Sequence, residues 1–145
     1  KIRNALNDGH IDLVNQYLGY SFKLSGIVEK GNQVGTSIGF PTANVRIENS
    51  KKIIPKDGVY AVKVHCLKNC FLGMLNIGFK PTFNINHKSI EVHIFDFSKN
   101  IYNEKITIEF IKRIRNEKKF PTVNQLKSQL VMDKITVLNI FNQAS

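Results

Sequence analysis

The sequence has few cysteines and lacks any hydrophobic run long enough to cross a bilayer. Two of its 145 residues are cysteines, so no disulfide framework holds the fold together. A chain of this length can bury a stable core without one. It contains no stretch of about 20 apolar residues and no signal-peptide pattern after Lys1. We therefore expect a soluble, cytoplasmic, single-domain protein with reduced cysteines and no membrane partner.

The shortage of cysteine also limits metal binding. Cys66 and Cys70 flank a predicted turn at 67–69, and zinc would need further ligands. His65 is adjacent in sequence, but along a strand it should point to the face opposite Cys66. We interpret the two thiols as structural, with a zinc site as the less favoured alternative.

The sequence also lacks a P-loop. No Gly-Lys-Ser/Thr follows the glycine-rich segment at 31–39, and the residues after it are β-like, which excludes a dinucleotide fingerprint as well. The segment nevertheless contains Gly31, Gly35 and Gly39, which would let the backbone approach a phosphate closely. Glycines at this spacing also occur in ordinary hairpins and bulges, so both interpretations stay open.

The tetrapeptide Pro41-Thr42-Ala43-Asn44 follows these glycines. On an extended strand Thr42 and Asn44 project to the same side, with Ala43 opposite. Hydroxyl and amide oxygens are neutral ligands that suit a hard cation such as Mg²⁺, and Pro41 would stiffen the segment that presents them. The tetrapeptide is therefore a candidate phosphate and metal site.

Basic residues outnumber acidic ones by 21 to 11, which gives a formal net charge of +10. Such a field attracts nucleotides, nucleic acid or acidic surfaces, although compositional bias alone can produce it. Six of the basic residues lie at 105–119. A nucleic-acid-binding barrel, with aromatic side chains on an exposed strand face beside a cationic groove, is therefore an alternative to a small-molecule enzyme.

Short strand-like runs dominate the sequence from residue 22 onward, with no long helix between them. They lie at 22–28, 40–47, 58–66, 70–77, 89–95 and 105–114. Alternation is clear where Val62, Val64 and Cys66 oppose Lys63 and His65. Six such strands imply antiparallel pairing, and closure into a small barrel would remove the sheet edges. We predict a mainly β fold.

Short helices are predicted before the strands. Residues 2–6 and 11–18 have helical patterns that Gly9 and Gly19 would end as C-caps. The patterns divide the chain into two parts, a helical lead-in at 1–20 and a barrel with a C-terminal helix at 21–145.

The C-terminal helix is predicted from its start signal. Thr122 and Gln125 have capping-box spacing. The apolar residues Val123, Leu126 and Leu130 then share one helical face. We expect this helix to pack on the barrel.

Two polar motifs could carry chemistry. Glu91, His93 and Phe95 share one face of the 89–95 strand, where a carboxylate and an imidazole could accept a proton from a substrate hydroxyl. Exposed strand faces more often carry such residues for solubility. The segment at 114–120 interleaves cations with an aromatic residue, which could grip a flat anionic ligand or simply solvate a loop and anchor the helix.

A third motif, at 76–83, leaves its predicted strand through Gly78 and Pro81 into a loop. Its simplest role is structural, because Gly78 would permit an unusual backbone angle and Pro81 would restrict the next turn.

In order along the chain, the motifs at 26–44, 58–61, 76–83, 91–97 and 114–120 resemble those of riboflavin kinases. More narrowly, they are similar to the kinase module at the C-terminal end of bacterial bifunctional riboflavin kinase/FMN adenylyltransferase. The resemblance runs from about residue 22 to about residue 133, and the lead-in resembles the linker after the adenylyltransferase domain.

The resemblance implies a six-stranded Greek-key barrel that transfers the γ-phosphate of ATP to the ribityl 5′-hydroxyl of riboflavin, giving FMN and ADP. It implies that Glu91 is the catalytic base and that Thr42 and Asn44 bind Mg²⁺. The nucleotide would be bound by Gly31, Gly35, Gly39, Thr42, Asn44, Ile94, Asp96 and Tyr102. The flavin would be held by Arg115, Lys118 and Phe120.

The sequence departs from this family at Thr36, where the bacterial proteins usually have a basic residue. The adenylyltransferase half is absent, so we expect a piece of a longer chain that does not make FAD by itself. A flavin-binding module without kinase activity and a nucleic-acid-binding barrel are the two alternatives, although the resemblance implies no nucleic-acid partner.

Overall fold

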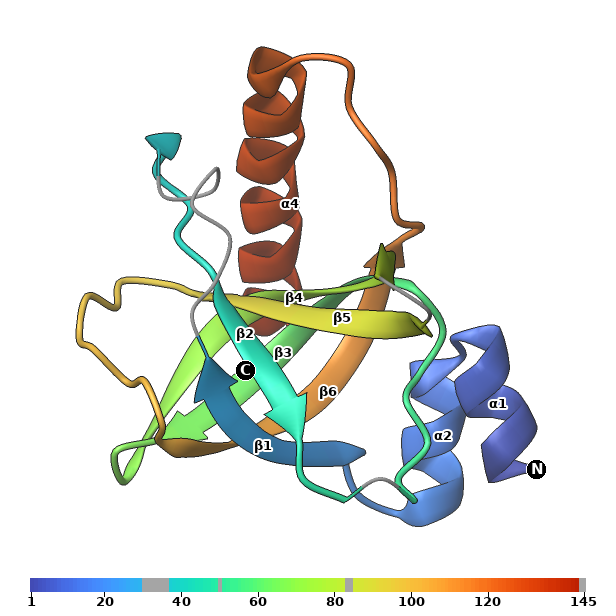
Figure 1. Ribbon diagram of the computed structural model, residues 1–145. Helices are drawn as coiled ribbons and strands as arrows, with labels where there is room; N and C mark the ends of the chain where they lie inside the picture. Colours follow the sequence, from blue (N-terminus) through green and yellow to red (C-terminus); the bar gives the residue numbers. More distant parts are fainter. Residues whose placement is uncertain (30–36, 50, 83–84, 144–145) are drawn as a thin grey trace.

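The computed structural model describes residues 1–29, 37–49, 51–82 and 85–143 of the chain. Within these residues six strands form one closed antiparallel barrel, in the order β1-β2-β5-β4-β3-β6 (Figure 1). The strands are β1 (Lys23–Glu29), β2 (Ala43–Ile47), β3 (Gly58–Cys66), β4 (Asn69–Thr82), β5 (Ile85–Ile94) and β6 (Lys105–Arg115). Because β6 returns beside β3 after the β3-β4-β5 meander, the barrel has the expected Greek-key connection.

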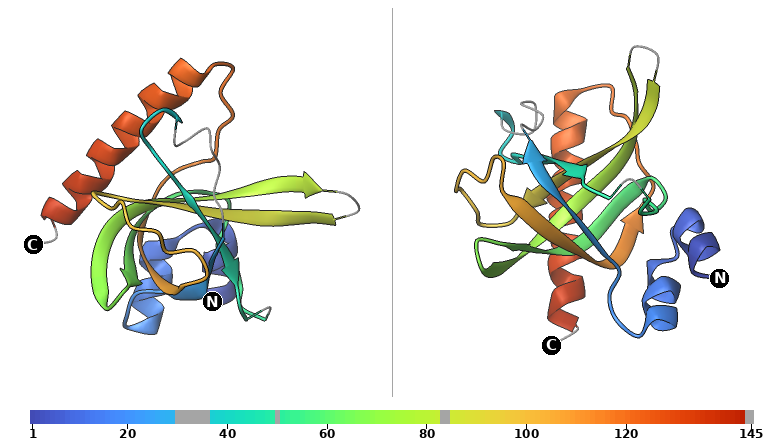
Figure 2. Two further views of the ribbon diagram at one scale, coloured as in Figure 1. Left: turned by 60° about the vertical axis from the view of Figure 1, so that its left-hand side comes forward. Right: turned by 60° about the horizontal axis from the view of Figure 1, so that its bottom comes forward.

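Three strands, β2, β4 and β5, differ from their predicted bounds by more than one residue, and β5 begins at Ile85 rather than at residue 89. β2 begins at Ala43 rather than at residue 40, since Gly39 has a φ of +87° and Pro41 has no N–H to donate to the ladder. β4 continues to Thr82 instead of entering a loop, and the β4–β5 hairpin extends beyond the barrel (Figure 2). Pairing of β4 with β3 ends at Ile77. Pro81 therefore lies on an edge, where a missing N–H is tolerated.

Gly78 does not have the backbone role that was expected of it. Its φ is not in the left-handed region, so no unusual backbone angle requires glycine there. Instead, a Cβ at this position would collide with the carboxylate of Glu117, which lies directly against the strand. This carboxylate is the far end of a flexible side chain that can move aside, so the contact shows that the segment after β6 packs closely on β4 but does not by itself require glycine.

The barrel interior is filled by side chains. Tyr60 and Phe110 are fully buried there, and their rings meet edge to face with centroids 5.2 Å apart. Leu75, Ile77 and Val92 belong to the same cluster. A close-packed interior of this kind has no room for a ligand the size of a nucleotide or a flavin, so binding sites must lie at the barrel mouth or on its outer face.

Helix α4 (Val123–Gln143) covers part of the outer face, over β4 and β6 (Figures 1 and 2). The backbone N–H of Gln125 donates to Thr122 Oγ1 at 3.2 Å, which confirms the predicted start of the helix. Val123 is 51% exposed, contrary to its predicted place on the packed face, and the most buried residues are Asp133 and Val137. Packing is tightest in the middle of the helix because the first turn lies beyond the barrel.

The face of β5 that carries His93 and Phe95 lies beneath this helix. Both side chains are buried, at 8% and 5% exposure, and Phe95 joins a cluster with Val137 of α4. The interpretation of this strand face as exposed and solubilising is therefore wrong at these two positions. Helix α4 covers a strand face that the alternating sequence pattern had predicted to be exposed to solvent.

Helices α1 (Ile2–Asp8) and α2 (Ile11–Leu18) end at Gly9 and Gly19, both left-handed as predicted. They pack on the barrel, where Asn15 Nδ2 donates to the carbonyl of Phe110 at 2.9 Å. The division of the chain at residue 20 stays a prediction. Among the helices in the described residues, none has the length and apolarity to cross a membrane.

Candidate active site

Three polar side chains form a row across the outer face of the barrel. In the strand register Glu91 of β5 lies opposite Asn44 of β2 on one side and Asn76 of β4 on the other. Directly opposed residues of antiparallel strands point to the same face. Adjacent residues alternate, so the neighbouring row with Val92 faces the interior. Sequence reasoning missed Asn76, because its motif was interpreted as structural.

Glu91 carries an unusual carboxylate. The side chain is half-buried, and its Oε1 is buried without a hydrogen-bond partner among the residues that the structure describes. Buried polar atoms are almost always hydrogen-bonded. An acceptor left in this state is suited to receive a hydroxyl proton from a bound ligand.

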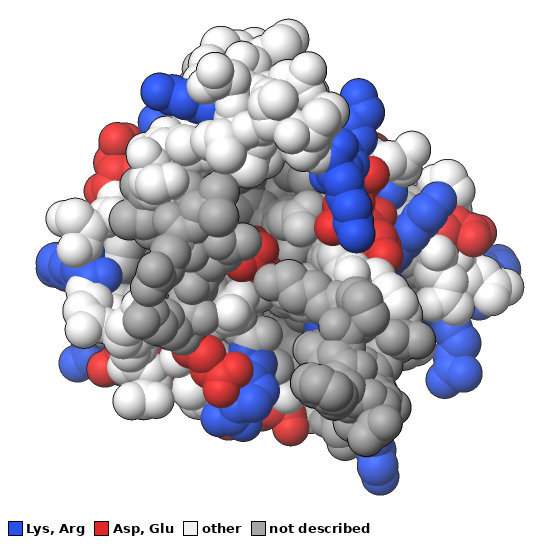
Figure 3. Space-filling view, turned by 45° about the horizontal axis from the view of Figure 1, so that its top comes forward, with Lys and Arg blue, Asp and Glu red and all other residues white. Residues whose placement is uncertain are grey.

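A cavity of about 170 Å³ opens beside Glu91, between the outer face of the barrel, α4 and the segment at 116–120; we call it the outer cavity. It brings together five of the predicted site residues, Thr42, Glu91, Arg115, Lys118 and Phe120. Apolar side chains from β4 and α4 complete its walls. Figure 3 shows a hollowed face with acidic side-chain atoms inside the hollow. An aromatic ring, apolar walls and flanking cations suit a flat, partly polar ligand.

A second cavity, of about 360 Å³, lies at the barrel mouth; we call it the mouth cavity. It is lined by Thr42, Ile94 and Tyr102, together with the segment at 97–101. Thr42 thus borders both cavities. Its Oγ1 is buried, with no hydrogen-bond partner in the described part of the chain. A polar group at this junction can reach a ligand in either cavity.

The remaining predicted residues lie elsewhere. Asp96 is an exposed turn residue with a φ of +54° and lines neither cavity. Asn44 lines a different hollow, beside Arg46, although it lies opposite Glu91 in the register. Gly39 is exposed. Gly31 and Gly35, with Thr36, lie outside the described residues.

The residues at the junction fit a magnesium ion held largely by its substrate. No group of three or more His, Cys, Asp or Glu side chains is gathered for a metal in the described residues. Mg²⁺ commonly has few protein ligands and keeps waters and substrate phosphates as the others. The partnerless Thr42 Oγ1 is an oxygen donor of the required kind.

His93 supports the segment that presents Thr42. Its Nδ1 lies 2.7 Å from the carbonyl oxygen of Pro41, and because that oxygen only accepts, Nδ1 must carry the proton. The ring also packs edge to face with Phe40 and Phe95. Burial lowers the pKa of His93, outweighing the bond to Pro41 that raises it, so the ring is neutral at physiological pH. Alternation had placed His93 beside Glu91 but could not indicate its partner.

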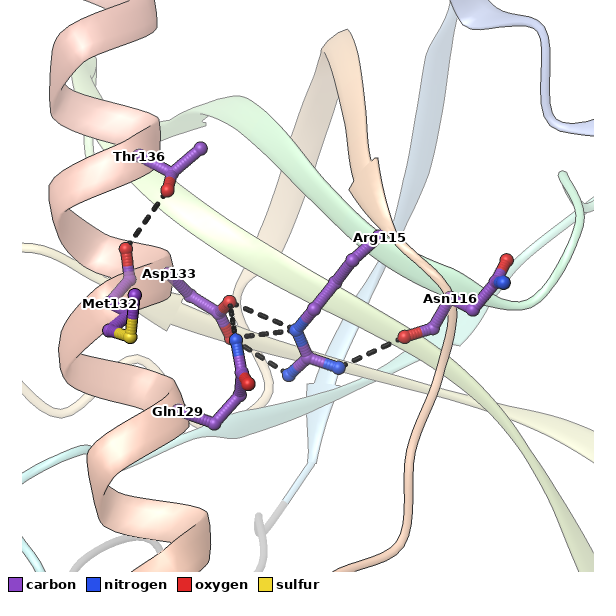
Figure 4. Close-up of polar contacts among 6 residues, drawn as sticks. All are labelled: Arg115, Asn116, Gln129, Met132, Asp133 and Thr136. Carbon is purple, nitrogen blue, oxygen red and sulfur yellow. Dashed lines mark hydrogen bonds and ion pairs between the residues drawn. The ribbon is translucent and has the colours of Figure 1, made fainter.

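Arg115 lines the outer cavity, but its guanidinium is directed toward α4. Figure 4 shows it against Asp133, with Nη2 to Oδ2 at 2.8 Å and Nε to Oδ1 at 2.9 Å. The guanidinium also lies 5.9 Å from the ring centroid of Phe120. Lys118, in contrast, is exposed. Asp133 was not expected at the site, because the residues around it in the sequence form an ordinary helical pattern.

Comparison with known proteins identifies the family of the chain. Residues 18–141 match the family model for riboflavin kinase. The bifunctional riboflavin kinase/FMN adenylyltransferases of Bacillus subtilis and Haemophilus influenzae are 44% and 43% identical to the chain. Both matches cover 97% of this chain but only 45% and 46% of the relatives. The chain therefore spans less than half the length of these curated relatives.

Two solved structures are also similar. One is described as a macrolide-efflux protein from Streptococcus pneumoniae, with a TM-score of 0.90 and 36% identity, over 95% of this chain and 45% of that one. The riboflavin kinase of Trypanosoma brucei has a TM-score of 0.58 at 18% identity, over 83% of this chain and 79% of that one, and supports the fold alone. With a family model that matches most of its length and curated relatives above 40% identity, the chain belongs to the riboflavin kinase family.

Proposed function

We propose that this chain transfers the γ-phosphate of ATP to the ribityl 5′-hydroxyl of riboflavin, giving FMN and ADP. The observation that carries the proposal is the position of Thr42, which borders both cavities while Glu91 lines one of them. Phosphoryl transfer depends mainly on positioning two substrates and stabilising charge between them. Two cavities that meet at a hydroxyl, beside a carboxylate, can position the two substrates, and a cation bound at that hydroxyl would stabilise the charge.

In this proposal riboflavin occupies the outer cavity. Its ring system lies against Phe120, with Arg115 and Lys118 at the edge, and its ribityl chain extends toward Glu91. The partnerless Oε1 of Glu91 accepts the proton of the 5′-hydroxyl while the 5′-oxygen of riboflavin attacks the γ-phosphorus of ATP. His93 holds Pro41 in place, so that Thr42 is presented at the junction.

The nucleotide occupies the mouth cavity, against Ile94 and Tyr102. By resemblance to the family, Gly31, Gly35 and Gly39 cover the phosphates with their backbone, and Asp96 contacts the nucleotide from its turn. Thr42 and Asn44 would hold Mg²⁺, which neutralises charge on the transferred group when bound. Apart from proton transfer to Glu91, the protein contributes by positioning the two substrates.

We further propose that the chain is the kinase module of a longer cytoplasmic protein with an N-terminal FMN adenylyltransferase domain. The curated relatives, which are named for both activities, support this because the chain covers about half of each. The chain by itself is expected to make FMN and not FAD.

Incubation with riboflavin, ATP and Mg²⁺, followed by chromatographic separation of riboflavin from FMN, tests the function. FMN should form, and EDTA should abolish its formation because the phosphates lose their counter-ion. Flavin binding without turnover would instead indicate a binding module. Salt-sensitive binding of an oligonucleotide with neither flavin binding nor turnover would indicate the nucleic-acid alternative.

A further inference from the structure

Helix α4 contains a buried carboxylate that its packing role does not require. Asp133 is 1% exposed, in the middle of the helix and on the face that meets the barrel. Buried carboxylates are costly unless they are paired and hydrogen-bonded. An apolar residue at this position would hold the helix on the barrel equally well, so the charge calls for a further explanation.

The carboxylate is fully engaged by side chains from two elements. Arg115 approaches through Nε, at 2.9 and 3.1 Å from the two oxygens, and through Nη2, at 2.8 Å. Gln129, one helical turn before Asp133, donates to Oδ1 at 2.9 Å. Figure 4 shows the three side chains converging, with Arg115 coming from the end of β6. This bidentate geometry fixes the plane of the guanidinium as well as its position.

The other side of the guanidinium faces the segment that closes the outer cavity. Nη1 of Arg115 donates to the backbone carbonyl of Asn116 at 3.0 Å, and Cζ of the guanidinium lies 5.9 Å from the ring centroid of Phe120. The segment at 116–120 has no regular secondary structure and contributes Lys118 and Phe120 to the cavity. Arg115 is thus held by α4 on one side and supports the cavity wall on the other.

We propose that Asp133, assisted by Gln129, is a positioning residue for the riboflavin cavity. It fixes Arg115, and Arg115 in turn fixes Phe120 and the start of the 116–120 segment. The inference rests on the proposed function, because it assigns riboflavin to the outer cavity. Neither α4 residue needs to touch the substrate.

The test compares Asp133→Asn and Gln129→Leu with a matched control, Val137→Ala. Val137 is fully buried on the same face of α4, one turn after Asp133, and lines neither cavity. For each variant of the full chain we would measure the KM for riboflavin, the KM for ATP, kcat and the thermal unfolding midpoint.

A misplacement of about 1 Å can cost roughly 10²-fold in an enzyme, so partial release of Arg115 should raise the riboflavin KM about tenfold. The KM for ATP should stay within about twofold, because the mouth cavity is lined by other elements. Val137→Ala should lower the unfolding midpoint without raising the riboflavin KM.

The proposal would be overturned if Asp133→Asn and Val137→Ala raised the riboflavin KM equally while lowering the unfolding midpoint by similar amounts. Asp133 would then serve only to anchor the helix. If Asp133→Asn does not fold, Gln129→Leu decides, since it removes one hydrogen bond and leaves the ion pair. An unchanged riboflavin KM in that variant also overturns the proposal.

Failure of the proposed function would look different. If the wild-type chain bound riboflavin but formed no FMN, only the proposed function would fail, whereas a chain that did not bind riboflavin would overturn both proposals. Quenching of riboflavin fluorescence would replace KM as the readout, with a roughly tenfold weaker Kd still expected for Asp133→Asn.

Discussion

Replacement of Glu91 by glutamine should separate catalysis from binding at the proposed active site. Gln has nearly the same shape as Glu but cannot accept a proton as a general base. In the structure Oε1 of Glu91 makes no hydrogen bond within the described residues, so the substitution breaks no identified contact of that oxygen. The neighbours in the row, Asn44 and Asn76, have neutral side chains and tolerate an amide between them.

The expected magnitude follows from these contacts. A positioned general base contributes about 10²–10⁴-fold to the rate, which corresponds to about 2.7–5.4 kcal/mol of the activation free energy at 1.36 kcal/mol per tenfold. The unfolding midpoint should change little, because Oε1 has no hydrogen-bond partner to lose within the described residues. Riboflavin affinity should change little, because Lys118 and Phe120, which we propose contact the ring, are untouched.

The assay is FMN formation at varied riboflavin and saturating ATP and Mg²⁺, with riboflavin fluorescence quenching as the independent measure of binding. We expect kcat to fall by at least about 10²-fold while the riboflavin Kd stays within about threefold. Turnover of Glu91→Gln within about threefold of the wild type would refute the assignment of Glu91 as base. If riboflavin affinity and kcat fell by similar factors, Glu91 would instead be a residue that binds the substrate.

Two further predictions concern other parts of the structure. His93→Leu removes the donor to Pro41 and should lower activity about 10- to 100-fold, as loss of a supporting hydrogen bond commonly does. His93→Asn, whose amide can reach the same carbonyl, should recover part of this activity. Activity is measured at varied ATP, and an equal loss of activity in the Leu and Asn variants would contradict the supporting role of His93. In the native protein at pH 8 iodoacetamide should alkylate exposed Cys70 and spare Cys66, because burial raises the pKa of the Cys66 thiol and the nearby Cys70 raises it further, so less thiolate is present. Mass spectrometry measures the labelling, and equal rates at both cysteines before unfolding would show that the Cys66 thiol is accessible to the reagent in the folded protein.

Most of the fold could be predicted from the sequence because its signals are local. Alternation identified the six strands, and Gly9 and Gly19 marked the two helix ends that the structure confirms. The strand boundaries that were predicted wrongly depend on pairing with another strand. β4 continues past Pro81 only because β5 pairs with it there, and no local pattern announces that partner.

The same distinction applies to the site. Motif order was enough to identify the family and to nominate Thr42 and Glu91, since these residues lie in short contiguous segments. That both border one cavity, and that Thr42 also borders a second, depends on the register between β2 and β5. The roles of the individual site residues stay predictions.

By itself, the sequence determined the barrel, the family and the polar residues available for chemistry, because each follows from periodicity or from motifs of a few residues. Only the tertiary structure decided which face of β5 is sheltered, that His93 holds Pro41 and that Arg115 is bound by Asp133. These contacts join residues 52 and 18 positions apart. Strand register and the packing of α4 bring them together, and neither is encoded in a local pattern.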